Sequence, residues 1–302
     1  MKRYISLILV ALMLLCLTAC GKKNSTAEED AAPQMEDLTE LTYCDGTVVT
    51  RLALQEDVWQ WVDDPTFPLD QDAVQALIDA LPALLQCENL NSHPTDDELT
   101  TYGLTEPKRY LEAGDAHFDI GRQQADGQWY MQINGDVTVY AAPDEIISLI
   151  NRSIYDIMIL PTLPAWDASN VLMMTFSAGD EVVRSYVNFG EDGWKSGGAN
   201  ADDDAAILIN DLTAIPLVGC ADYAPAEGAA EVCGLAPAVA SVSVNYSNGT
   251  GNDLQMTLSV GNLRSSDNCR YLTIGEDPTI YLVPQESLVS LLQAAGITET
   301  EE

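Results

Sequence analysis

The stretch Tyr102-Gly103-Leu104-Thr105-Glu106-Pro107 organises this chain, because a shorter form of it returns as Cys233-Gly234-Leu235-Ala236-Pro237. The residues before Gly103 have the pattern of a short helix with an acidic start, and extended segments follow Pro107. A glycine after a helix commonly takes the left-handed conformation that ends it. We therefore expect Gly103 to close a helix and lead into a group of strands.

Matching residues lie on both sides of the two stretches at a nearly constant spacing. It is 133 residues from Trp61 to Trp194 and 141 residues from Tyr140 to Tyr281, with an insertion near 245–252. The other pairs are Cys87 with Cys220, Leu104 with Leu235, Gly121 with Gly261, and Pro143 with Pro284. This order indicates an internal duplication, and two copies predict two similar lobes rather than a solenoid.

Apolar periodicity and turn signals predict an α+β fold, with an antiparallel meander and packed helices in each lobe. In the first half, Asp70 or Asp72 should cap a helix that Pro82 bends or ends. We expect first-half strands at 47–54, 58–62, 109–113, 117–121, 128–133 and 137–141, and helices at 72–85, 95–101 and 144–154. We expect second-half strands at 171–176, 181–187, 239–246, 254–260, 270–274 and 279–283, and helices at 201–212 and 285–294.

The N-terminus has the parts of a secretory signal: basic Lys2 and Arg3, then an apolar run over 5–17. The run ends in Leu17-Thr18-Ala19-Cys20, which resembles a bacterial lipobox. The resemblance implies cleavage before Cys20 and acylation of its thiol, and two or more acyl chains anchor a protein stably. We expect a lipid-anchored protein on the extracytoplasmic side of a bacterial cell membrane.

The charge balance limits the partners of this chain of 302 residues, which carries 47 acidic and 13 basic side chains and a net charge of −34. Nucleic-acid binding needs clustered lysine and arginine, so we exclude it. Residues 20–40 are rich in polar and charged residues and are expected to form a flexible tether behind the lipid. The hydrophobic fraction of 47% is sufficient for a sizeable folded core.

Several motifs in this order resemble DUF4340, a domain of unknown function found in bacterial lipoproteins. They are the tryptophan before an Asp-rich turn, the Tyr-Gly-Leu-x-x-Pro stretch at 102–107, the Ile-Gly end of a strand at 120–121, and the Val-Tyr pair at 139–140. The resemblance implies DUF4340-like repeats at 41–155 and 168–296, and some members accompany ABC-type export systems. In the second copy Cys233 replaces the tyrosine, so we expect its Gly-Leu turn to be built differently.

Histidine offers one candidate catalytic pair, because His117 lies two residues before Asp119 on a predicted strand. A serine hydrolase needs a nucleophile beside such a pair, and no Gly-x-Ser-x-Gly motif supplies one. The other histidine, His93, lies in a predicted loop. We interpret both as ordinary surface residues and expect no catalytic residues.

Neither the acidic residues nor the glycine-containing stretches match a motif that binds a metal ion or a cofactor. The run Asp202-Asp203-Asp204 lacks the spacing of a calcium loop and falls at a helix start, where carboxylates favour the helix dipole. No phosphate loop or dinucleotide motif occurs, no acidic pair is singled out for glycoside hydrolysis, and no Cys-x-x-Cys or His-Cys cluster occurs. We therefore expect neither a cofactor nor a metal.

The candidate binding residue is a tryptophan, Trp59, and the sequence signal for it is weak. Trp59 and Trp61 share a strand face, and Trp61 has a counterpart in Trp194, which favours a core role for that pair. Trp59 has no counterpart, so we predict that it is the exposed member and can stack on a sugar or a partner protein.

Five cysteines follow the predicted lipidation site: Cys44, Cys87, Cys220, Cys233 and Cys269. Five is an odd number, so at least one has no partner within the chain. We favour mostly buried, unreactive thiols over a bridge such as Cys220–Cys233.

These patterns favour a signal peptide at 1–19, the tether at 20–40 and two lobes. The hypothesis we prefer is a lipid-anchored protein that binds a partner, such as an envelope or ABC-type export protein, without catalysis. The alternative is a lipoprotein that holds a sugar or peptide in a cleft between the lobes.

Overall fold

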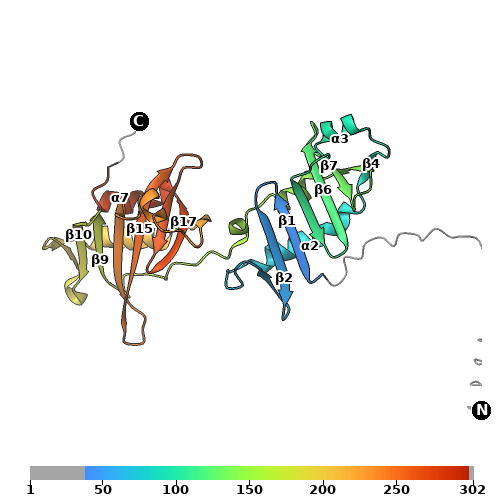
Figure 1. The fold of residues 1–302 in the computed structure, drawn as a ribbon. Helices are drawn as coiled ribbons and strands as arrows, with labels where there is room; N and C mark the ends of the chain where they lie inside the picture. The colour runs from blue at the N-terminus through green and yellow to red at the C-terminus, as the bar shows by residue number, and fades with distance from the viewer. Residues whose placement is uncertain (1–37, 299–302) are drawn as a thin grey trace, which may run out of the picture. The chain divides into compact units, whose positions relative to one another are not determined.

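Two antiparallel sheets, joined by a short connection, organise the residues from 38 to 298, which this computed structural model describes (Figure 1). All of them fall within the unit that extends from Met35 to Glu302. The predicted signal peptide, Cys20 and most of the predicted tether lie outside the described residues. The architecture is α+β, with few helices beside the two sheets.

The first sheet has eight strands in the order β3-β2-β1-β5-β6-β7-β8-β4. Its strands are β1 (Glu40–Asp45), β2 (Val49–Gln55), β3 (Val58–Trp61), β4 (Glu88–Asn91), β5 (Arg109–Ala113), β6 (Ala116–Gln123), β7 (Trp129–Ile133) and β8 (Val139–Ala142). The register pairs Tyr43 of β1 with Thr50 of β2 on one side and with Leu111 of β5 on the other.

The second sheet has nine strands in the order β12-β11-β10-β9-β14-β15-β16-β17-β13. Its strands are β9 (Val171–Ala178), β10 (Glu181–Asn188), β11 (Trp194–Ser196), β12 (Ala199–Asn200), β13 (Gly219–Asp222), β14 (Ala240–Ser247), β15 (Asp253–Arg264), β16 (Cys269–Ile274) and β17 (Asp277–Pro284). Without β12, this order follows that of the first sheet position by position, with β9 at the place of β1 and β13 at the place of β4.

Short helices accompany each sheet. They are α2 (Gln71–Leu84), α3 (Asp96–Tyr102), α4 (Asp144–Ile150) and the 3-10 turn η1 (Ile154–Ile157) with the first sheet, and η2 (Gly190–Asp192), α5 (Asp202–Thr213), α6 (Ala229–Val232), η3 (Gln285–Leu288) and α7 (Val289–Ala294) with the second. Of the described helices, none is both long and apolar enough to cross a membrane.

Helix α2 forms where the sequence predicts it. The Asp70 side chain accepts hydrogen bonds from the backbone N–H groups of Asp72 and Ala73, at 3.0 and 3.2 Å. This is how an aspartate caps a helix start. Pro82 lies inside the last turn, and the helix ends shortly after it, at Leu84. The buried positions recur at helical spacing: Val74, Leu77, Leu81 and Leu84.

Five strands were not predicted: β1 and β4 of the first sheet, and β11, β12 and β13 of the second. The β4 segment is polar and half-exposed to exposed, so it has no alternation that could identify it. It becomes a strand because β8 offers it a free edge, with Asn89 paired to Tyr140. Strand β1 lies inside the sheet, between β2 and β5. The sequence predicted that the folded part begins near Leu41, but it predicted no strand there.

The two glycine joints have the same backbone. Gly103 and Gly234 have φ values of 76° and 68°. The Leu104 N–H donates to the Leu99 carbonyl at 2.9 Å, and the Leu235 N–H donates to the Ala230 carbonyl at 2.7 Å. The expectation that the second Gly-Leu turn is built differently is therefore wrong at the glycine and the leucine. The path to the proline does differ, since the Ala236–Pro237 peptide bond is cis.

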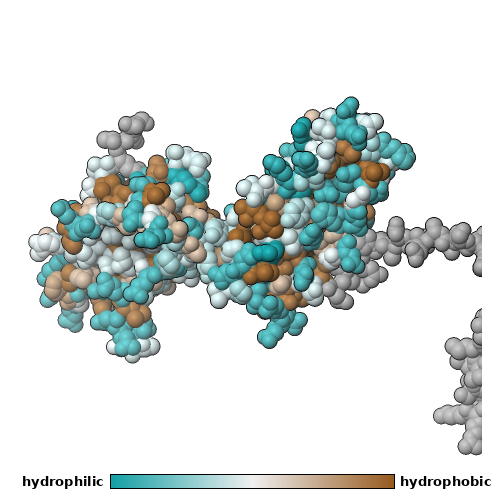
Figure 2. Space-filling model, in the orientation of Figure 1, coloured by the Kyte–Doolittle hydropathy of each residue, from teal (hydrophilic) through white to brown (hydrophobic). Residues whose placement is uncertain are grey.

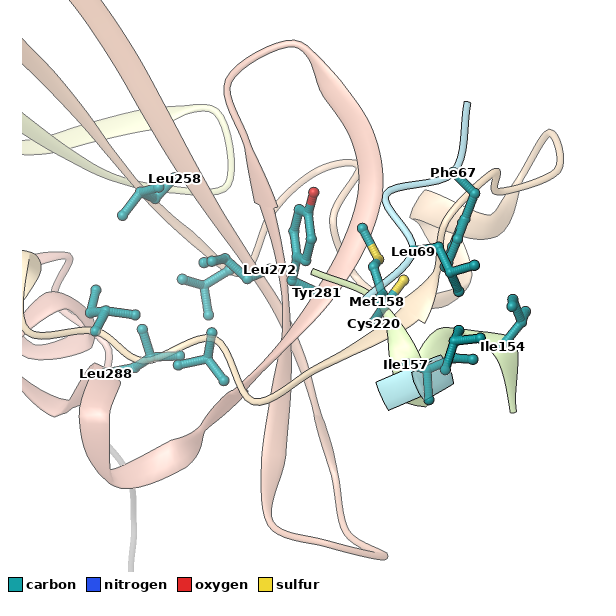
Figure 3. Packing of buried hydrophobic residues seen from close by; sticks show 14 of the residues in the cluster. Phe67, Leu69, Ile154, Ile157, Met158, Cys220, Leu258, Leu272, Tyr281 and Leu288 are labelled. Carbon is teal, nitrogen blue, oxygen red and sulfur yellow. The ribbon is translucent and has the colours of Figure 1, made fainter. Parts of the chain in front are cut away.

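One cluster of buried hydrophobic residues includes members of both sheets, and Figure 3 shows part of it from close by. Its largest fully buried side chains include Tyr43 and Phe118 from the first sheet and Tyr186 and Tyr281 from the second. On the face shown in Figure 2, hydrophilic residues predominate, with hydrophobic residues in smaller groups between them. This surface agrees with the strongly acidic composition.

Candidate functional site

The connection between the sheets lies against the segment that precedes α2. Met158 forms an isolated antiparallel bridge with Leu69. The Ile159 N–H donates to the Pro68 carbonyl at 2.7 Å, and the Asp70 N–H donates to the Ile157 carbonyl at 2.9 Å. These bonds hold the connection in an extended form at the edge of the first sheet.

Aromatic rings join this segment to the second sheet. Phe67 is buried, and its ring centroid lies 4.9 Å from that of Tyr223 in an edge-to-face arrangement. The Phe67 centroid also lies 5.3 Å from that of Trp61 and 6.2 Å from that of Tyr155. Edge-to-face and offset pairs are the favourable geometries for aromatic side chains. We call this place, with Phe67 at its centre, the junction.

A cavity of about 620 Å³ opens at the junction. Most of its wall is apolar, and its polar groups come mainly from the hairpin around Asp277. Its lining residues are Thr66, Pro68, Met158, Ile159, Leu160, Pro161, Tyr223, Ala224, Asp277, Pro278, Thr279 and Tyr281. We call it the junction cavity.

The polar groups of the junction cavity are bonded to one another. The Tyr281 hydroxyl donates to Asp277 Oδ2 at 2.8 Å, and the Thr279 N–H donates to Asp277 Oδ1 at 2.9 Å. The Thr279 hydroxyl donates to the Tyr223 carbonyl at 3.2 Å, which ties β17 to the segment after β13. The site is thus preorganised, with a carboxylate held at the mouth of an apolar cavity.

Two opposing effects act on the pKa of Asp277. Burial favours its neutral form, but hydrogen bonds from the Thr279 backbone and side chain and from the Tyr281 hydroxyl outweigh burial and lower the pKa. Burial raises the pKa of Tyr281, and the hydrogen bond to Asp277 raises it further. At neutral pH the cavity therefore presents one anionic oxygen pair and a neutral phenol.

The nearby thiol does not supply a nucleophile. Cys220 in β13 pairs with Tyr281 in the ladder, and burial raises the pKa of its thiol to about 11. The thiolate is the reactive form of cysteine, so this group is inert at neutral pH. The arrangement can hold an apolar group beside a cation.

One comparison with known proteins gives a match for part of this structure. The family described as "Domain of unknown function (DUF4340)" matches residues 59–159. This segment is a DUF4340 domain. Comparison with curated proteins and with solved structures gave no match.

The sheet to which the DUF4340 domain belongs includes strands that lie outside the matched segment. Residues 59–159 begin in β3 and end in the wall of the junction cavity. Strands β1 and β2 precede the match, yet they lie between β3 and β5 in the sheet. Without them β3 would have no strand partner, because each of its ladder bonds goes to β2. The DUF4340-like character of 168–296 stays a prediction.

Trp59 is not exposed, so the prediction about its position in the DUF4340 domain is wrong. Its side chain is 7% exposed and belongs to the core, whereas Trp61 is half-buried. The ring belongs to the buried hydrophobic cluster. The Gln71 side chain accepts from the Trp59 N–H at 2.8 Å and donates to the Trp59 carbonyl at 2.9 Å. This amide covers the free edge of β3 and holds the ring against α2. Trp59 still lines a cavity of about 470 Å³, and its role in binding stays a prediction.

His117 lies on the exposed face of the DUF4340 domain between two carboxylates. Its Nδ1 is 3.2 Å from Glu112 Oε1 and its Nε2 is 3.1 Å from Asp119 Oδ1. Its ring stacks on Tyr110 with centroids 5.8 Å apart. Among the described residues, no serine, threonine or cysteine is hydrogen-bonded to either ring nitrogen, so the pair with Asp119 has no third member.

The remaining candidates are the acidic run at 202–204, a metal site and the cysteines. Asp202, the first residue of α5, accepts from the Trp194 N–H and from Asn200, and these bonds, the first above all, lower its pKa. Among residues 38–298, no group of histidine, cysteine and acidic side chains could hold a metal ion. The five cysteines in the described part of the chain are free: Cys44, Cys87, Cys220, Cys233 and Cys269. Cys20 lies outside the described residues.

Sequence reasoning missed the junction cavity, although a signal for it was present. The motif Asp-x-Thr-x-Tyr occurs at 136–140 and again at 277–281. In both copies the threonine N–H donates to the aspartate, at 3.3 Å for Thr138 and 2.9 Å for Thr279. The motif predicts the turn but not the cavity, because Pro68, Ile159 and Tyr223, which also line it, come from distant parts of the chain.

Proposed function

We propose that this protein is a lipid-anchored, extracytoplasmic protein that binds a partner protein without catalysing a reaction, and that the junction cavity receives an apolar segment of the partner. The observation that carries the proposal is the cavity of about 620 Å³ with apolar walls and a fixed carboxylate. Recognition sites of this kind are concave and mostly apolar, with a few placed polar groups.

The chemistry of the cavity suggests which segment of a partner fits. Pro68, Ile159 and Pro278 offer apolar surface, and Asp277 offers a charge at the mouth. A lysine or arginine next to an apolar residue complements both features, and opposite charges speed encounter and set orientation. The net charge of −34 favours a basic partner surface in the same way and argues against nucleic acid.

The anchor follows from the sequence alone. The lipobox that ends at Cys20 supports acylation on the outer side of a bacterial cell membrane, and an envelope or ABC-type export protein is a suitable partner there. A Cys20→Ala variant should stay unprocessed or be released from membranes. A variant that is processed and remains in the membrane fraction would contradict the anchor.

The partner proposal is tested by recovery of the full chain from detergent-solubilised membranes. Ile159 lines the junction cavity and is 55% exposed, so Ile159→Asp should fold and should lower partner recovery about tenfold or more. Ile207 is the matched control, because it is 58% exposed and lies elsewhere, on α5. Equal recovery of a partner by both variants, or no stable partner with the native chain, counts against the proposal.

A second candidate function is the capture of a sugar or peptide in the same cavity. Its volume of about 620 Å³ falls in the range of roughly 300–1,000 Å³ that small-ligand sites occupy. A ligand that binds only the folded state raises the melting temperature in a concentration-dependent way. Such a shift, lost in Ile159→Asp and kept in Ile207→Asp, would favour this candidate over the first.

We also infer that the two sheets derive from duplication of one unit. Three observations support it: the parallel strand orders, the two glycine joints, and the two Asp-x-Thr-x-Tyr turns. If so, the insertion over 245–252 and the added β12 are later changes in the second copy. Separate expression of 38–159 and 160–302 tests this, since each half of a duplicated pair should form its own sheet.

A further inference from the structure

A second cavity, of about 200 Å³, lies among β10, α5 and α7 in the second half of the chain. It shares no lining residue with the junction cavity. We call it the α5–α7 cavity. The side chains that the argument uses are Arg184 and Tyr186 from β10, Asp204 and Ile207 from α5, and Ser290 and Gln293 near the C-terminus.

Arg184 brings a cation to this cavity in a chain that has only 13 basic residues. Its Nη1 donates to the Tyr186 hydroxyl at 3.3 Å. Tyr186 is 2% exposed and its ring packs edge-to-face on Phe176, so it is a rigid support for the guanidinium. A guanidinium has five N–H donors, and within the described residues Arg184 forms no ion pair within 4 Å.

Asp204 brings an anion to the same cavity. It lies in the first turn of α5, where the helix dipole stabilises a carboxylate. No side-chain hydrogen bond of Asp204 occurs among the described residues, in contrast to Asp202 in the same turn, which bonds to Trp194 and Asn200. The cavity therefore carries a positive and a negative group that are not joined to each other.

The other walls suit a small amphipathic molecule. The Ser290 hydroxyl donates to Asp211, which leaves its lone pairs to accept a hydrogen bond. The Gln293 amide can donate and accept, and Ile207 adds an apolar surface. A volume of about 200 Å³ is below the usual range of roughly 300–1,000 Å³ for larger ligands, so an oligosaccharide or a folded segment does not fit.

We propose that the α5–α7 cavity binds a free α-amino acid as a zwitterion, with its carboxylate on Arg184 and its ammonium group on Asp204. The planar guanidinium matches a carboxylate in a two-bond geometry. Asp204 disfavours a ligand that carries only negative charge, and Arg184 disfavours one that carries only positive charge. Both charges are therefore required of the ligand.

Titration calorimetry of the full chain in detergent micelles tests this, with L-alanine, N-acetyl-L-alanine and L-alaninamide as probes. We expect L-alanine to bind with a Kd of about 1 mM, and each blocked analogue, which lacks one charge, to bind about tenfold or more weakly. Arg184→Gln and Asp204→Asn should each weaken L-alanine binding by a similar factor. Both side chains are exposed, so these variants should fold.

Arg51→Gln is the control for loss of a positive charge, since Arg51 pairs with Asp63 in the first sheet. It should leave L-alanine binding unchanged. Equal binding of N-acetyl-L-alanine and L-alanine, equal binding by native and Arg184→Gln protein, or no binding of L-alanine would each overturn the proposal. None of these outcomes bears on the junction cavity, because Arg184 and Asp204 are not part of its wall.

Discussion

A Cβ atom on Gly121 would lie 2.3 Å from the carbonyl oxygen of Tyr102. The same relation recurs in the second sheet, where a Cβ on Gly261 would lie 2.2 Å from the carbonyl oxygen of Cys233. In each case the strand after the joint passes directly against the end of the short helix. The two glycines are therefore required by close approach, since the obstacle is backbone and cannot rotate away.

The first prediction concerns these two glycines. Gly121→Ala and Gly261→Ala should each lower the free energy of unfolding by about 1–3 kcal/mol, because overpacking forces the backbone to shift. Urea unfolding measures the effect. Gly219→Ala is the control: it is also a strand glycine, but its added Cβ would lie 3.4 Å from the movable end of Leu282. An equal loss in all three variants would show that close approach is not the cause.

The second prediction concerns the centre of the junction. Phe67 is 5% exposed, so Phe67→Ala should cost about 3–5 kcal/mol through lost burial and the cavity that remains. Phe189 is 56% exposed, and Phe189→Ala should change stability by less than about 0.5 kcal/mol. Denaturant titration of the two variants tests this. A small effect at Phe67 would mean that the aromatic contact with Tyr223 adds little to the fold.

The third prediction is a pH dependence that arises at Asp277. Its pKa is lower in the folded state, so its contribution to stability is present above the unfolded value of about 3.9 and is lost as the pH falls through the folded value. Asp277→Asn should therefore flatten the fall in stability at acid pH. Because the side chain is exposed, solvent screening keeps this change small.

Thermal melts of native and Asp277→Asn protein between pH 7 and pH 3 measure the difference. Asp144 offers a control, since its Oδ1 accepts a hydrogen bond from Trp129 Nε1 at 2.8 Å in the first sheet. Asp144→Asn removes a hydrogen-bonded carboxylate outside the junction cavity, and its melting curves are recorded beside those of the other two proteins. Parallel curves for native and Asp277→Asn protein would refute the assignment.

The fourth prediction concerns the order in which thiols react. The cysteines that are half-buried, Cys87 and Cys233, should be alkylated by iodoacetamide before Cys44, Cys220 and Cys269, which are buried. Burial raises the pKa of Cys220 to about 11, so it should react last at pH 8. Mass spectrometry of digests after timed labelling gives the order. Early modification of Cys220 in native protein would contradict its burial.

Local patterns predicted the parts of this fold that depend on near neighbours in the chain. The Asp70 cap, the buried face of α2 and the left-handed glycine at the end of α3 follow from the side chains of a few adjacent residues. Strand β4 was missed for the opposite reason, because its pairing with β8 comes from a partner about 50 residues away. Trp59 was misplaced because its ring packs in the buried hydrophobic cluster, which residues far apart in the chain form together.

The sequence by itself determined the α+β class, the glycine joints and most strand positions, and it carries the stretch resembling a lipobox on which the proposed anchor depends. It also shows matching residues at a nearly constant spacing in the two halves, on which the proposed duplication depends. Only the tertiary structure decided which strands are neighbours, and that Pro68, Ile159, Tyr223 and Asp277 meet at one cavity. Periodicity describes contacts within a turn or a strand, whereas a cavity is formed by packing between segments far apart in the chain.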